Sequence, residues 1–61
     1  MEIVSKHIGQ TVKTVVVSGA PSHADAVTFA MAATGETPGR LQDWDTDQYE
    51  DGYVTVRLYT A

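Results

Sequence analysis

One helix signal in the middle of the chain constrains the fold more than any other feature of the sequence. Residues 19–21 (Gly-Ala-Pro) break a β-type run, and Ser22 with Asp25 forms a capping box, in which each side chain satisfies a free backbone N–H group. Gly35 supplies the C-terminal stop, so the sequence predicts a helix over residues 23–34. The apolar face that would lie on a sheet consists of Ala26, Val27, Ala30 and Ala33, flanked by Phe29 and Met31.

β-branched residues predict three strands around this helix. Residues 2–8 and 11–18 flank a Gly-Gln turn signal, and residues 53–59 alternate apolar with polar or aromatic side chains. The order is therefore ββαβ. We expect one small α+β domain over residues 1–61, a three-stranded antiparallel sheet with the helix packed on one face. We also expect the last strand to lie beside the first.

The register of the first hairpin has two solutions. A three-residue turn lets Val4 and Ile8 share a face with apolar residues of the second strand. A two-residue turn places Lys6 opposite Lys13, where like charges repel, so we favour the first solution. The uncovered sheet face would then be apolar and suited to a homodimer, with Ile3, Val15, Val17, Tyr53 and Tyr59 as the oligomer face.

Size and charge limit the function. A chain of 61 residues without cysteine forms no disulfide or thiolate zinc site, so association with itself or a partner is the available source of added stability. The absence of cysteine also fits the cytoplasm, which would be the host cytoplasm for a viral protein. Four basic against eight acidic residues argue against nucleic acid and membrane surfaces as partners. No signal peptide or apolar run of about 20 residues is expected.

A run of acidic residues between positions 43 and 51 contains a tryptophan and a tyrosine. Its first three aspartates resemble the start of an EF-hand calcium loop, but Gln48 replaces the required Gly and Val54 replaces the bidentate Glu, so no metal site is predicted. A solvated loop is one alternative. The other is a partner-binding loop, consisting of Asp43, Trp44, Asp45, Asp47, Tyr49, Glu50 and Asp51.

In extended backbone, residues two apart are separated by about 6.6 Å, so alternate aspartates would form a regular row of anions. Such a row imitates a nucleic-acid backbone or steers the domain onto a basic protein surface. The aromatic residues would anchor the contact. The alternative for Trp44 is that it folds back with Leu41 to cap the open edge of the core, and both roles can hold together. We also allow for a short helical turn over residues 41–44.

No catalytic or cofactor-binding residues are predicted. Ser18, Ser22, His7 and His23 lack the nucleophile elbow and the third orienting residue that a Ser-His pair needs. Isolated glycines give no phosphate-binding motif. The sequence therefore indicates a non-enzymatic protein.

The chain resembles small phage-encoded inhibitors of host enzymes in three elements. These are the hairpin, the capped helix of residues 24–33 and the closing Gly-Tyr-Val-Thr-Val-Arg strand at residues 52–57. The inhibitors of bacterial RNA polymerase have a similar ββαβ order, size and acidic charge. The resemblance implies a stoichiometric protein ligand, and it transfers no contact residue. The alternative is a small structural or assembly protein that self-associates through its open sheet face.

Overall fold

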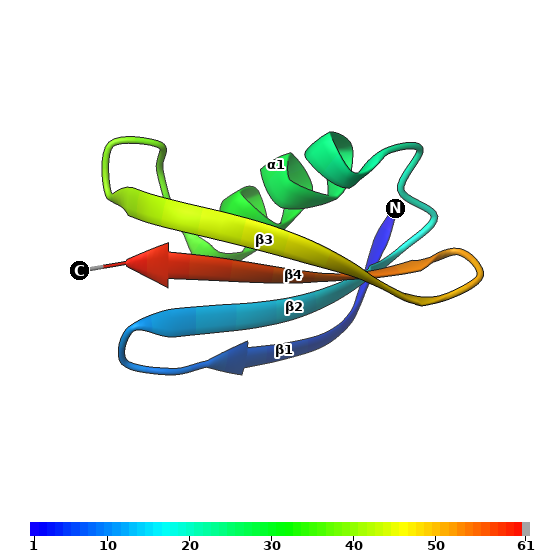
Figure 1. Ribbon diagram of the computed structural model, residues 1–61, viewed down its shortest axis with the longest axis horizontal. Helices are drawn as coiled ribbons and strands as arrows, with labels where there is room; N and C mark the ends of the chain where they lie inside the picture. The colour runs from blue at the N-terminus through cyan, green and yellow to red at the C-terminus, as the bar shows by residue number, and fades with distance from the viewer. Residues whose placement is uncertain (61) are drawn as a thin grey trace.

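The computed structural model describes residues 1–60, without the side chain of Tyr49, as one four-stranded antiparallel sheet with a helix against it (Figure 1). The elements are β1 (Glu2–Ile8), β2 (Val12–Ser18), α1 (His23–Thr34), β3 (Leu41–Glu50) and β4 (Tyr53–Thr60). The strands lie in the order β1-β2-β4-β3, so β1 and β3 are the edges.

This ββαββ order shows that the expected three-stranded ββαβ sheet is wrong. Residues 41–50, expected as a loop with a short helical turn, form β3, and β4 lies between β2 and β3 instead of beside β1. Aspartate is disfavoured in strands, which is why the run was interpreted as a loop. The Asp51-Gly52 pair joins β3 to β4, and Gly52 takes a φ of 81° that other residues rarely adopt.

The helix prediction is confirmed at both ends. Ser22 is the N-cap, and its Oγ accepts a hydrogen bond from the Asp25 N–H group at 3.1 Å. The Asp25 carboxylate accepts a hydrogen bond from the Ser22 hydroxyl at 2.9 Å, in place of the expected one from the Ser22 backbone. Gly35 is left-handed, and its N–H group donates to the Met31 carbonyl.

Near its turn the first hairpin adopts neither register considered from the sequence, whereas at its open end Ile3 pairs with Val17 as in the favoured register. Ile8 pairs with Lys13 and Lys6 with Val15, because the Gly9 N–H group donates to the Val12 carbonyl at 2.9 Å and closes a longer connection. A shift of one residue exchanges the two faces of a strand.

Part of the predicted oligomer face is wrong, because β2 pairs Val15 with Val56 and Val17 with Val54 on the side that α1 covers. Val15 and Val17 are fully buried beneath α1, and Ile3 packs partly buried against the same core. Tyr53 and Tyr59 belong to the open face, since they alternate with the buried residues of β4. The buried core consists of Val15, Val17, Ala26, Val27, Ala30, Val54, Val56 and Leu58.

A buried ion pair ties the chain after the helix to the sheet. Glu36 follows the helix, its side chain is almost fully buried, and it pairs with the Lys13 ammonium of β2. The Lys13 hydrogen bond lowers the pKa of the Glu36 carboxyl; burial opposes this, and the charges of Lys13 and Arg40 reinforce it. The pair therefore stabilises the fold while Glu36 is ionised.

Within residues 1–60, no helix combines the length and apolar character that crossing a membrane requires.

The register predicts opposite outcomes for two adjacent valines. Val15→Lys should unfold the chain, because it places an unpaired ammonium in a fully buried position. Val16→Lys should keep its circular dichroism spectrum and a cooperative melt, because Val16 pairs with Thr55 on the open face and is only partly buried. A folded Val15→Lys together with an unfolded Val16→Lys would contradict the register.

The Glu36–Lys13 pair predicts a pH-dependent stability. Because the folded-state pKa is lowered, the contribution should be complete above the ordinary value of 4.5 and lost as the pH falls below it. Urea unfolding of wild type and Glu36→Gln should therefore differ most above pH 5, and the difference should shrink towards pH 3. Glu2→Gln, at an exposed site, is the control and should show no such trend. If the difference in unfolding free energy between wild type and Glu36→Gln did not change with pH, the Glu36–Lys13 pair would not be its source.

Candidate functional site

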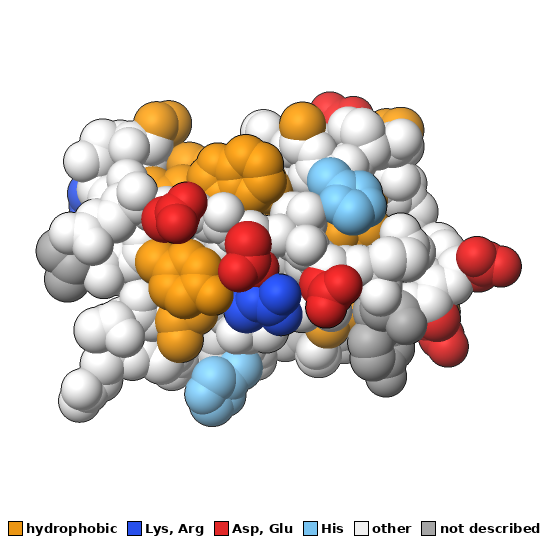
Figure 2. Space-filling model, in the orientation of Figure 1, with side chains coloured by type: hydrophobic (Ala, Val, Ile, Leu, Met, Phe, Trp, Pro, Cys, Tyr) orange, Lys and Arg blue, Asp and Glu red, His pale blue; other side chains and the backbone are white. Residues whose placement is uncertain are grey.

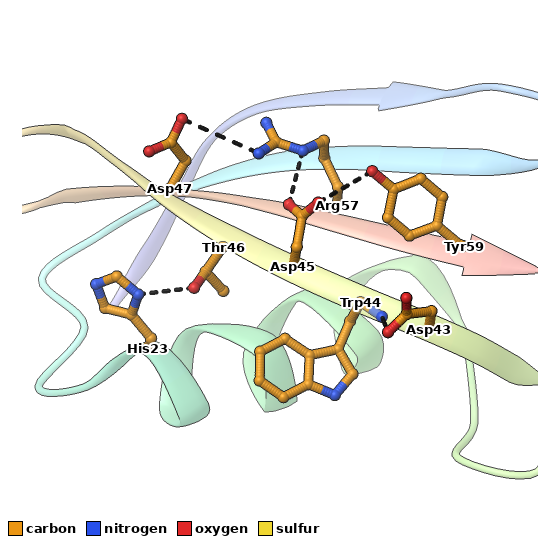
Figure 3. A network of polar contacts seen from close by, with 8 residues as sticks. All are labelled: His23, Asp43, Trp44, Asp45, Thr46, Asp47, Arg57 and Tyr59. Atoms are coloured by element: carbon orange, nitrogen blue, oxygen red, sulfur yellow. Dashed lines mark hydrogen bonds and ion pairs between the residues drawn. The ribbon is translucent and has the colours of Figure 1, made fainter.

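The strand structure of β3 divides the acidic run between two faces of the sheet. Asp43 pairs with Tyr59 and Asp45 with Arg57, on the open face, whereas Trp44 pairs with the buried Leu58 on the helix side. Figure 3 shows Asp45 and Trp44 on opposite sides of β3. The single acidic and aromatic surface expected from the sequence is therefore two surfaces that share one edge strand.

On the open face, an arginine joins the acidic row, by which we mean Asp43, Asp45 and Asp47. The Arg57 Nε atom lies 2.7 Å from Asp45 Oδ1, and one of its terminal nitrogens lies 4.0 Å from Asp47 Oδ2. The Tyr59 hydroxyl donates to the second Asp45 oxygen at 3.1 Å. Figure 2 shows acidic side chains arranged around a basic group on this face.

The consequence is an uneven charge along the row. Partial desolvation lowers the pKa of Arg57, but attraction and hydrogen bonding from Asp45 raise it above its ordinary value, so the guanidinium stays charged. The positive charge of Arg57 therefore offsets the negative charge of Asp45. The Asp47 side chain is 72% exposed and has only the long contact to Arg57, so it presents its charge to solvent.

On the helix side, Trp44 borders a groove between α1 and the start of β3. The groove has a volume of about 350 Å³. Trp44 is 47% exposed, an unusual position for so large an apolar side chain. The Trp44 groove is lined by Val27, Met31, Pro38, Leu41, Gln42, Asp43 and Trp44.

The outer edge of β3 is open along the described part of the chain, because β3 pairs there with β4 alone. The Trp44 N–H group donates to the Asp43 carboxylate at 2.8 Å, so this amide points away from β4. His23 and Thr46 share a hydrogen bond of 2.7 Å between α1 and β3 (Figure 3). The His23–Thr46 hydrogen bond links the edge strand to the start of the helix.

The remaining predicted residues lie at the far end of β3. Glu50 and Asp51 are exposed at the turn, where the Gln48 side-chain amide donates to the carbonyls of Glu50 and Tyr53 at 2.6 and 2.9 Å. The side chain of Tyr49, also predicted to bind a partner, lies outside the described residues.

Sequence reasoning missed two parts of this site. It did not place Arg57 against the acidic row, and, although it considered Trp44 beside Leu41, it did not foresee that Met31 of α1 completes a groove there. The contact of Arg57 with the acidic row follows once β3 and β4 are recognised as a hairpin. The signal was the Asp51-Gly52 pair, since Asp-Gly between two strands is a strong hairpin indicator.

The geometry does not resemble a calcium loop. The three aspartates extend along a strand at intervals of about 6.6 Å, so they do not converge on one ion. Among the described residues, no group of three His, Asp or Glu side chains is placed to hold a metal ion.

Comparison of the chain with protein-family models, with curated proteins and with solved structures finds no match. The resemblance to phage-encoded inhibitors stays a prediction, and the ββαβ order on which it partly rested is not the order found.

Proposed function

We propose that this chain is a non-enzymatic protein-binding module that presents its edge strand β3 to a basic partner surface. One observation carries the proposal: β3 is an edge strand with an acidic row on one face and a half-exposed Trp44 on the other. Exposed tryptophans at a groove are typical anchors of protein interfaces. Inhibition of a host enzyme is the consequence that the resemblance to phage inhibitors implies, with the cytoplasm as the compartment.

Electrostatics supports a basic partner. The chain has a net charge of −4, and β3 contributes Asp43, Asp45, Asp47 and Glu50 without a basic residue of its own. Two of the four basic side chains, Lys13 and Arg57, are already paired within the fold. The field around β3 therefore attracts cations and raises the rate of encounter with a basic surface.

Self-association through the open sheet face is the alternative. α1 contacts β2, β3 and β4 from one side, and the opposite face presents Tyr53 and Tyr59. A stable dimer in light scattering would favour this alternative.

Removing exposed charge from β3 should slow binding to the partner. Proteins retained from a lysate by immobilised wild type should be lost with Asp43→Asn/Asp47→Asn, and a purified partner should associate several-fold more slowly with this variant. Its salt dependence should also flatten, because exposed charges are screened beyond about 8–10 Å. Asp45 is left unchanged so that the Arg57 pair survives.

Single variants provide the matched control. Asp47→Asn and Glu2→Gln each remove one exposed carboxylate from an edge strand, the first from β3 and the second from β1. Only Asp47→Asn should slow association. Equal effects of the two variants would show that net charge matters and β3 does not, which would contradict the proposed function.

A further inference from the structure

We propose that β3 and the Trp44 groove bind an extended segment of the partner whose residues alternate between basic and apolar, and that this segment adds to the sheet as a fifth strand beside β3. The inference rests on the proposed protein-binding function and specifies the chemistry of the partner and the way it is held.

Of the two edge strands, β3 is better suited than β1 to pair with an added strand. β1 is interrupted by a register shift between Ile3 and Ser5, and such a bulge twists an edge away from further pairing. The pairing of β3 with β4 is regular from Asp43 to Gln48, and its register shifts lie outside this stretch. A regular stretch of six residues is long enough to bind an extended peptide through its main chain.

A backbone donor already points to the place of the incoming strand. The Trp44 N–H group faces away from β4 and donates to the Asp43 carboxylate at 2.8 Å. A carbonyl of an added strand can replace that carboxylate oxygen. The exchange keeps the amide hydrogen-bonded and releases the Asp43 carboxylate to bind a cation of the partner.

The two faces of β3 determine which side chains the segment needs. Side chains of an added strand alternate between the faces in step with those of β3. Those on the open side meet Asp43, Asp45 and Asp47, which favour Lys or Arg. Those on the helix side meet Trp44 and the groove beside it, where Met31 offers an adaptable apolar contact.

The size of the groove fits this role. A volume of about 350 Å³, lined mainly by apolar side chains and open beside Trp44, suits one or two aliphatic side chains from the segment. The acidic row supplies the charge complementarity that excludes an uncharged or acidic segment. Trp44 links the two features, because it belongs to the regular stretch of β3 and also borders the groove.

A capped synthetic peptide, Thr-Lys-Leu-Lys-Val-Lys-Thr, tests the inference directly. Trp44 is the one tryptophan of the chain, so its emission reports occupancy of the groove. The peptide should shift this emission to the blue in a saturable manner and perturb the backbone NMR signals of residues 43–47. A peptide of the same composition with the three lysines consecutive should bind at least tenfold more weakly.

N-methylation of peptide amides separates strand addition from simple charge attraction. In an antiparallel addition, the Leu and Val amides face β3, because they lie opposite Trp44 and Thr46. Methylating these two amides should abolish binding, whereas methylating two lysine amides should change affinity less than threefold. Tolerance of both modifications would overturn the inference.

Protein variants complete the test, with binding measured by the anisotropy of a labelled peptide. Trp44→Ala should weaken binding at least tenfold, and Ile8→Ala, which truncates a similarly exposed side chain on the other edge, should leave it within twofold. Circular dichroism confirms that both variants are folded. If partner capture depends on Asp47 but no peptide binds, strand addition is wrong while the proposed function stands.

Discussion

The pairing of β3 with β4 is the interaction on which the rest of this small structure depends. β4 carries Val54, Val56 and Leu58, all buried, and it needs a neighbour on each side to keep them from water. Burying one such side chain contributes about 1.5–3 kcal/mol. Exposing two or three of them would cost about as much as the whole stability of a small domain, which is often near 5 kcal/mol.

The acidic row limits what the exposed edge of β3 can pair with. An open edge strand invites pairing with another copy of itself, and charged side chains along it oppose that. Two copies of β3 side by side would bring like charges together, which is destabilising. A basic segment meets the same charges as an attraction, so under the proposed function the same aspartates would both disfavour self-pairing and select a partner.

Local signals in the sequence were sufficient for part of this fold. The capped helix and the strands β1, β2 and β4 carry propensities that agree with their final structure. β3 could not be found in the same way, because its aspartates disfavour a strand and only the pairing with β4 makes it one. The face of Val15 was missed for a different reason. β2 carries valines on both of its faces, and only the pairing of Val15 with Val56 and of Val17 with Val54 shows which face α1 covers.

The arrangement of the candidate site was not predicted, because residues 41–50 were expected to be a loop. Once residues 41–50 are a strand, alternation separates the acidic row from Trp44 and places the row against Arg57. The sequence predicted these residues as one partner-binding surface on a loop, whereas the strand divides them between two faces. What it could not supply was the groove, since Met31 and Leu41 are ten residues apart and meet Trp44 only in the folded chain.

Amide hydrogen exchange along residues 43–48 tests the central claim, that the acidic run is an edge strand paired on one side. If it is correct, the amides of Asp45 and Asp47, which face β4, are protected, and those of Trp44 and Thr46, which face the open edge, exchange faster. This alternation with a period of two is the predicted result. Uniformly fast exchange over the six residues would contradict the account, because it would show a solvated loop.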